Sequence, residues 1–333
     1  MARAPTRGAP SNMSSEISTS IIVCTRNRAA SLRRTLRPLG ELSIPAGWQV
    51  ELLIVDNGST DDTAAVARDA RPGRLAVRYV LEPEPGKSRA LNRAIAEARG
   101  EYLLFTDDDV APRTDWVERM VTPMLNGACD AVNGQIILAP DLTRPWLTEM
   151  HMSWLALSLG AGSRDWAREL IGANMGFRRA VLQRVPGYDP ELGPGSPSGG
   201  VCEDTLLGMQ LAAAGFRIAY VEDAIVVHHL DPSRLQRQHW LGFARGRGRN
   251  WAYIRYHWKH DDIRAPRLQA AWYAAKLGLR RRLQPPPALD AEGCPPWEMS
   301  YAFRLELCRQ FVRERRRPRN YARGGLVKSL ATP

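Results

Sequence analysis

The fold is decided by nine consecutive residues, Tyr102-Leu103-Leu104-Phe105-Thr106-Asp107-Asp108-Asp109-Val110. The apolar first half is typical of a strand that is buried on both faces, and three carboxylates follow at its carboxyl end. In open α/β sheets, ligands bind outside the carboxyl ends of the strands. Adjacent carboxylates repel one another unless a cation offsets their charge, and Mg²⁺ or Mn²⁺ bound by carboxylate and substrate phosphate oxygens would do so. The alternative is a solvated acidic turn, since aspartate is a common turn and N-cap residue.

Apolar runs and amphipathic segments alternate along the first 125 residues. Four strand-then-helix units of this kind predict a mostly parallel sheet flanked by helices. The first strand is not followed by Gly-x-Gly-x-x-Gly, which argues against a dinucleotide-binding domain. The pattern predicts strands at Ser20–Thr25, Val50–Asp56, Leu75–Leu81 and Tyr102–Thr106, and helices from about Ser31, from Thr60 to Asp69, at Gly86–Ala98 and at Trp116–Leu125.

The next hundred residues continue the alternation around a long loop. Pro186–Gly200 holds five Gly and four Pro, and loops of this length in compact domains are usually functional or mobile. The loop leads into a helix that opens with Cys202-Glu203-Asp204-Thr205 and ends at Gly215. The other predictions are strands at Ala131–Leu138, Leu170–Phe177, Phe216–Tyr220 and Ala224–Val227, a helix at Trp146–Leu159 and a short helix up to Val185.

Charge divides the 333-residue chain into two unlike parts. Residues 231–333 hold 22 Lys+Arg against 8 Asp+Glu, whereas residues 1–230 hold 24 against 27. The basic part looks mostly helical and is interrupted by Pro285–Pro287. Its charge indicates an anionic partner: a membrane surface, nucleic acid or a phosphate-bearing substrate.

The cysteines and the N-terminus bear on the compartment. Five scattered cysteines without Cys-x-x-Cys indicate neither a zinc knuckle nor a disulfide framework, and they favour a reducing, cytoplasmic setting. No apolar run approaches the roughly 20 residues that span a bilayer. Residues 1–17 lack the apolar core of a secretory signal and are expected to form a disordered tail.

Several polar residues stand where strands end or helices begin. Asp56 could accept an N–H of a nucleotide base or only shape a turn. Lys87 and Arg89, at a helix N-terminus after Gly86, could face a diphosphate or form a solvated first turn. Glu203-Asp204 could supply a general base or cap a helix.

The histidine pair His228-His229 follows the last predicted strand. Next to a metal site, one imidazole could ligate the ion, and the alternative is a histidine satisfied at a strand end.

The order of these motifs resembles the family 2 glycosyltransferases of the GT-A fold, from about Ser18 to His229. The resemblance implies an α/β fold with a Rossmann-like nucleotide-binding half at about 18–110, an acceptor half at about 111–230 and a basic helical extension at 231–333. It also implies an inverting transferase that uses a nucleotide-diphospho-sugar, usually a UDP-sugar, with Mg²⁺ or Mn²⁺. The acidic triplet and the Glu203-Asp204 pair are the most specific parts of the match.

The resemblance assigns a role to each motif. Asp204 would be the catalytic base, with Glu203 as its neighbour. Asp109 would ligate the metal, and of the two histidines we favour His228 as a further ligand. The triplet is wider than the usual Asp-x-Asp, so the role of Asp108 stays open. On the nucleotide-sugar side, the prediction places Thr25, Arg26, Asn27, Asp56, Lys87, Arg89 and Asp107, and it includes Asp108 with them.

The expected acceptor is a hydroxyl of a saccharide or a lipid-linked molecule, as in polysaccharide biosynthesis at the cell envelope. Within His239–Trp251, Arg and Gly alternate between two Trp residues. This composition suits contact with the anionic inner face of the cell membrane. Three alternatives remain: a protein that binds nucleic acid through its basic region, a nucleotidyltransferase, and a pseudoenzyme that only binds a nucleotide-sugar.

Overall fold

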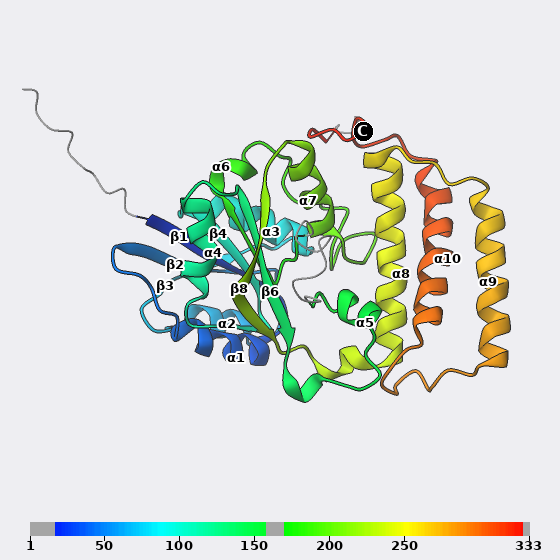
Figure 1. Cartoon of the computed structure of the whole chain (residues 1–333), viewed down its shortest axis with the longest axis horizontal. Helices are drawn as coiled ribbons and strands as arrows, with labels where there is room; N and C mark the ends of the chain where they lie inside the picture. Colours follow the sequence, from blue (N-terminus) through cyan, green and yellow to red (C-terminus); the bar gives the residue numbers. More distant parts are fainter. Residues whose placement is uncertain (1–16, 158–169, 329–333) are drawn as a thin grey trace, which may run out of the picture.

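The computed structural model describes residues 17–157 and 170–328, and one mixed sheet forms the centre of the described chain (Figure 1). Its strands follow the order β3-β2-β1-β4-β7-β6-β8-β5. The strands are β1 (Ile17–Thr25), β2 (Trp48–Asp56), β3 (Ala76–Leu81), β4 (Tyr102–Asp107), β5 (Val110–Pro112), β6 (Ala131–Leu138), β7 (Asn174–Arg178) and β8 (Ile218–His228).

Helices connect and cover these strands. In chain order they are α1 (Ala29–Gly40), α2 (Thr63–Arg68), α3 (Lys87–Glu97), α4 (Trp116–Leu125), α5 (Glu149–Trp154), α6 (Arg179–Leu182), α7 (Glu203–Ala213), α8 (Arg237–Tyr253), α9 (Pro266–Leu283) and α10 (Pro296–Glu314). A π-helical turn, η4 (Ile254–Lys259), continues α8.

The directions of the paired strands confirm the prediction of a mostly parallel sheet. β1 pairs in parallel with both β2 and β4, whereas β7 runs antiparallel to β4 and β6, and β5 antiparallel to β8. The register sets Thr25 opposite Asp56 and Cys24 opposite Asp107. The polar residues that follow β1, β2 and β4 therefore emerge at the same edge of the sheet.

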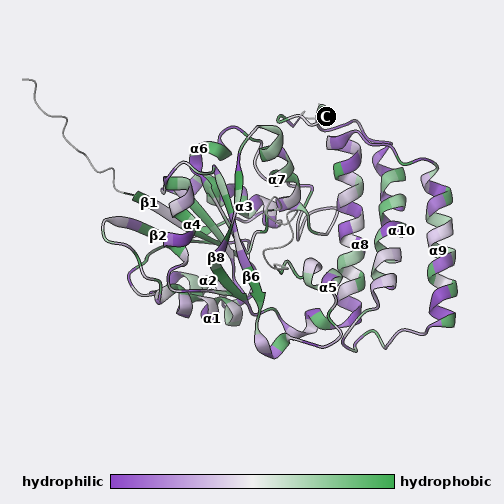
Figure 2. Cartoon of the chain, viewed as in Figure 1, coloured by the Kyte–Doolittle hydropathy of each residue, from purple (hydrophilic) through white to green (hydrophobic). Residues whose placement is uncertain are grey.

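Alternating side chains bury both faces of the sheet. In β1, Ile21 and Val23 pack with the helices α1, α2 and α4, whereas Ile22 packs with α3 and α7 on the other face. Both faces are covered, so the central strands read as continuous apolar runs, and Figure 2 colours them largely hydrophobic. This is why the stretch before the acidic triplet identifies a central strand.

Several predicted boundaries were wrong. The helix predicted at Trp146–Leu159 is limited in the described chain to α5, with the last residues of that prediction outside the described ranges. The two strands predicted at 216–227 form the single strand β8, because a shift in its pairing with β6 accommodates the polar residues 222–223. The strand predicted from Leu170 begins at Asn174.

Two further differences lie at short or terminal segments. β5 was missed, since three residues carry too little pattern to predict a strand. Ile17 begins β1, and the remaining residues of the predicted tail, 1–16, lie outside the described ranges.

The C-terminal helices stand side by side beyond the sheet, with α10 between α8 and α9 (Figure 1). Close packing explains the two glycines of the Arg/Gly alternation in α8. A Cβ at Gly246 would lie 2.9 Å from Gly200 Cα, and one at Gly248 would lie 2.5 Å from the carbonyl oxygen of Phe303 in α10. These glycines let α8 approach the 186–200 loop on one side and α10 on the other. In the described parts of the chain, no helix is both long and apolar enough to span a bilayer.

We predict that Gly248→Ala lowers the free energy of unfolding by about 2 kcal/mol, because overpacking against the α10 backbone outweighs the gain in helix propensity. Gly278→Ala in α9 is the matched control, since a Cβ there meets no atom within 4 Å. The control is expected to gain up to about 1 kcal/mol. Urea unfolding of both variants measures the difference, and equal effects would contradict the close contact between α8 and α10.

Candidate active site

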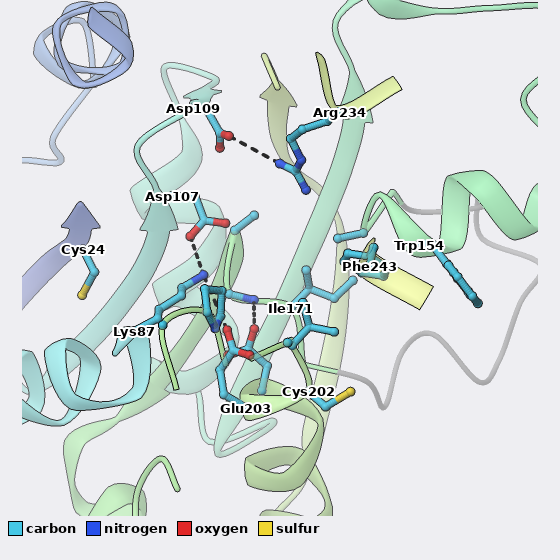
Figure 3. Close-up of a pocket in the computed structure, with 18 of the residues that line it drawn as sticks. Cys24, Lys87, Asp107, Asp109, Trp154, Ile171, Cys202, Glu203, Arg234 and Phe243 are labelled. Atoms are coloured by element: carbon cyan, nitrogen blue, oxygen red, sulfur yellow. Dashed lines mark hydrogen bonds and ion pairs between the residues drawn. The ribbon is translucent and has the colours of Figure 1, made fainter. Parts of the chain in front are cut away.

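A cavity of about 1040 Å³ opens at the carboxyl edge of the central strands (Figure 3). Its wall also includes the start of α7, the end of α5 and one side of α8. Nine of the predicted site residues line it: Thr25, Arg26, Lys87, Asp107, Asp108, Asp109, Glu203, Asp204 and His228. The fold therefore brings together carboxylates that lie about a hundred residues apart in the chain.

The three adjacent carboxylates have different sets of cationic or polar partners, although Asp108 and Asp109 share Arg28. Asp107 Oδ1 lies 2.9 Å from Lys87 Nζ (Figure 3). Asp108 accepts a 2.6 Å hydrogen bond from the Thr25 hydroxyl and lies 3.0 Å from Arg28 Nε. Burial raises the pKa of Asp108 to about 7, although Arg28 opposes the rise. Asp108 is therefore held as a buried structural group, with its oxygens already bonded.

Asp109 lies next to His228 because β5 pairs with β8 directly after the triplet. His228 Nε2 is 3.3 Å from Asp109 Oδ1, while Arg28 and Arg234 lie 2.8 and 3.6 Å from Oδ2. Burial would raise the pKa of Asp109, but the contact with His228 and the charges of both arginines hold that pKa below its usual value. Asp109 is thus a carboxylate at any physiological pH.

Lys87 lies between the acidic triplet and the Glu203-Asp204 pair (Figure 3). Its ammonium also lies 3.8 Å from Glu203 Oε1. Burial works to lower the pKa of Lys87, but the charges of Asp107, Glu203 and Asp204 raise it well above its usual value. The cavity therefore contains a half-buried lysine that stays protonated between two groups of carboxylates.

Asp204 lies in the first turn of α7, where its Oδ2 accepts a 2.8 Å hydrogen bond from the backbone N–H of Gly172. Its Oδ1 is buried and has no hydrogen-bond partner in the described chain. Burial and the charge of Glu203 raise the pKa of Asp204 to about 8, against the opposing charge of Lys87. This combination is typical of a general base whose partner is a substrate hydroxyl.

Three predicted residues do not line the cavity. Asp56 is buried and accepts hydrogen bonds from the Ser59 N–H and the Tyr79 hydroxyl. Asn27 holds the Thr60 backbone, and Arg89 forms an exposed ion pair with Glu84. Their assignment to the nucleotide-sugar stays a prediction.

A sequence model described as "Glycosyl transferase family 2" matches residues 20–185, which run from within β1 to beyond β7 and include the acidic triplet. An uncharacterized glycosyltransferase of Mycobacterium bovis is 30% identical over 155 residues, which cover 45% of this chain and 67% of that protein. The chain belongs to glycosyltransferase family 2. It is also 27% identical to a succinoglycan biosynthesis protein of Rhizobium meliloti, over 78% of this chain and 80% of that one.

Solved structures support the fold of the glycosyltransferase. A mannosyltransferase from Pyrobaculum calidifontis, in complex with GDP-Man and Mn²⁺, matches 88% of this chain and 86% of its own with a TM-score of 0.57 and 20% identity.

The chain spans about half the length of three other curated relatives, between 43% and 51%.

Sequence reasoning missed several residues around the cavity of the glycosyltransferase. Arg28 and Arg234 neutralise the triplet, but an isolated arginine carries no distinguishing pattern. Gly172 could have been noted only as a glycine within a predicted strand, yet a Cβ there would lie 2.8 Å from Asp204 Oδ2. A further part of the cavity wall comes from Trp154 in α5 together with Gln236, His239, Phe243 and Arg247 in or next to α8.

The long Gly/Pro loop of the glycosyltransferase is anchored to α8 and to the segment that follows α10. Asp189 lies in it, buried, and accepts hydrogen bonds of 2.7 and 2.6 Å from the hydroxyls of Tyr253 and Tyr321. Lys328 Nζ lies 2.6 Å from the other carboxylate oxygen. At the far end of the loop, Arg249 donates to the carbonyl oxygen of Gly199. The basic region therefore holds the loop that precedes the Glu203-Asp204 pair.

Proposed function

We propose that this family 2 glycosyltransferase transfers a sugar, with inversion, from a nucleotide-diphospho-sugar to a hydroxyl of a saccharide or lipid-linked acceptor. A UDP-sugar is the first donor class to consider. Within the proposed division, residues 18–110 bind the nucleotide and residues 111–230 form the acceptor half, to which α8 of the basic extension adds part of the cavity wall. The buried, unpartnered Oδ1 of Asp204, in the same cavity as the acidic triplet, is the observation that carries the proposal.

In the proposed reaction, the acceptor oxygen bonds to the anomeric carbon as the bond from that carbon to the diphosphate breaks. The hydroxyl proton passes to Asp204, and the nucleoside diphosphate leaves with the electron pair. The negative charge that develops on the diphosphate favours nearby cations, and Lys87, Arg28 and Arg234 lie on the triplet side of the cavity. Attack from the opposite side inverts the anomeric configuration.

A divalent metal is part of the proposal, with Asp109 and His228 as its protein ligands. The donor set is suitable, because a buried imidazole lies beside a buried carboxylate and neither ring nitrogen has a hydrogen-bond partner in the described chain. Among the described residues, no three His, Cys, Asp or Glu side chains are clustered to hold an ion, so the donor phosphates would supply further ligands. When bound, the metal would stabilise charge on the leaving diphosphate.

The acceptor side has an aromatic wall. The rings of Trp154 and Phe243 have centroids 5.8 Å apart, and the Arg247 guanidinium lies 5.6 Å from the Trp154 centroid. Burial and the charge of Arg234 lower the pKa of His239 to about 4, so this cavity residue stays neutral. Apolar ring faces beside polar groups suit the mixed surface of a saccharide. The similarity to a succinoglycan biosynthesis protein agrees with such an acceptor.

Thermal unfolding with a panel of UDP-, GDP-, dTDP- and CDP-sugars, with and without Mn²⁺, tests the proposal. We expect a Mn²⁺-dependent rise in Tm with one nucleotide class, since a ligand at 100 times its Kd adds about 2.7 kcal/mol to the free energy of unfolding. Turnover of that donor, with the product's anomeric configuration read by NMR, tests inversion. No shift with any donor, together with a clear shift with nucleic acid, would overturn the proposal.

The pKa of Asp204 sets an expected pH dependence. The base must be deprotonated to accept a proton, and burial raises its pKa to about 8. We therefore expect kcat/KM to rise about tenfold per pH unit below pH 8 and to level off above it. Asp108 also titrates, at about 7, so an Asp108→Asn variant is the control and should keep the limb near pH 8. If kcat/KM did not change between about pH 6 and 9, a range that includes both pKa values, the role of Asp204 would be contradicted.

A further inference from the structure

The helix α9 is the outermost of the three C-terminal helices and has an unusual exposed face (Figure 1). Eight large hydrophobic side chains are strongly exposed in the described chain, and four of them lie on α9. Their exposed fractions are 73% for Leu268, 51% for Trp272, 60% for Leu279 and 72% for Leu283. An apolar cluster of this kind on one surface element needs an explanation.

These four side chains form a single stripe. At 100° per residue, positions 268, 272, 279 and 283 fall within an arc of about 60° of the helix. Leu277 lies on the opposite side and is buried. The helix therefore has apolar residues on two sides. Leu277 packs inward, and the stripe of four side chains faces outward.

Cations flank the stripe. The α9 sequence contains five basic residues and no acidic one. Arg281 faces α10, where it forms an ion pair with Glu298. Arg267, Lys276 and Arg282 are exposed. Lys276 Nζ lies 3.9 Å from the centre of the exposed Trp272 ring. In Figure 2, α9 alternates between strongly hydrophilic and hydrophobic colours.

The stretch from which the sequence predicted membrane contact, 239–251, has a different role. Trp240 is 1% exposed, and Gly246 and Gly248 pack against the loop and α10. Phe243 and Arg247 line the cavity. Many side chains of α8 are therefore buried or line the cavity. The exposed surface that suits a membrane lies on α9 instead.

We propose that the outer face of α9 binds the surface of an anionic phospholipid bilayer. The leucines and the tryptophan would enter the boundary between headgroups and acyl chains, and Lys276, Arg267 and Arg282 would contact the anionic headgroups. Charge complementarity decides the occupant, because a second copy would bring like charges together on this acid-free helix. The proposed binding needs no turnover, so it can fail or hold independently of the proposed transferase reaction.

Flotation of the full chain with lipid vesicles tests the proposal. We expect the chain to float with phosphatidylcholine vesicles that contain phosphatidylglycerol, and to float poorly with phosphatidylcholine alone or at high salt. A variant carrying Leu268→Gln, Trp272→Gln, Leu279→Gln and Leu283→Gln should bind at least about tenfold more weakly. Lys276→Gln together with Arg282→Gln should weaken binding about fivefold per charge.

Leu81→Gln with Leu125→Gln is the matched control, since both leucines are exposed but lie outside α9. The control should bind vesicles like the unchanged chain, and unaltered melting temperatures would show that all variants fold. Equal binding to neutral and anionic vesicles, or full binding by the α9 variant, would overturn the proposal. Loss of a lipid-free dimer in that variant, seen by analytical ultracentrifugation, would instead show that α9 joins two copies and would also overturn it.

Discussion

Asp204→Asn is expected to lower kcat by about 10³-fold, within the range for loss of a general base, while donor binding stays nearly unchanged. The amide keeps the shape of the side chain and can still accept the hydrogen bond from Gly172 N–H, but it cannot take a proton. Because burial raises the pKa of Asp204 to about 8, the neutral amide resembles the form that predominates at pH 7. The melting temperature should therefore change little, and single-turnover kinetics with donor titration would separate chemistry from binding.

Glu203→Gln is the matched control for Asp204→Asn. Glu203 is also buried in the first turn of α7, but its carboxylate lies 3.8 Å from Lys87 and it is the neighbour of the proposed base. We expect a smaller loss of kcat, without removal of the pH-dependent limb. Wild-type turnover in Asp204→Asn, or an equal loss in both variants, would show that Asp204 is not the base.

Asp109→Asn is expected to lower kcat/KM by about 10³-fold, which corresponds to about 4 kcal/mol of lost charge stabilisation. The variant should also lose the Mn²⁺-dependent part of the donor's thermal shift. The physical reason is that an amide is a weak ligand for a divalent ion, and that Arg28 and Arg234 would lose their shared carboxylate partner. Isothermal titration of donor with and without Mn²⁺ measures the effect directly.

Two variants keep the Asp109 prediction testable if Asp109→Asn folds poorly. His228→Gln leaves the carboxylate and its arginine partners in place, and it should weaken Mn²⁺ dependence by about 10- to 100-fold. Asp108→Asn is the matched control, because Asp108 is already bonded to the Thr25 hydroxyl and Arg28. If Asp108→Asn abolished the Mn²⁺ dependence and Asp109→Asn preserved it, the metal would belong to Asp108.

The sequence alone determined the mostly parallel sheet and the family, which the structure and the comparisons confirm. Central strands are buried on both faces, so β1, β2 and β4 are continuous apolar runs that can be read without the structure. The carboxyl ends of parallel strands meet at one edge, and this placed Thr25 and the acidic triplet together. The residues that the motifs contain could be identified because both their types and their order are distinctive.

Only the tertiary structure decided which partner each residue has. Arg28 and Arg234 neutralise Asp108 and Asp109 from distant segments, and no local pattern marks them. The structure also buries much of α8, where the sequence predicted membrane contact, and leaves an exposed apolar stripe on α9, where we propose it. Local composition is similar in the two helices, but glycine contacts bury α8 whereas no element covers the outer stripe of α9 within the described chain. Burial and charge pairing depend on what packs against a segment, and one segment's sequence does not contain that information.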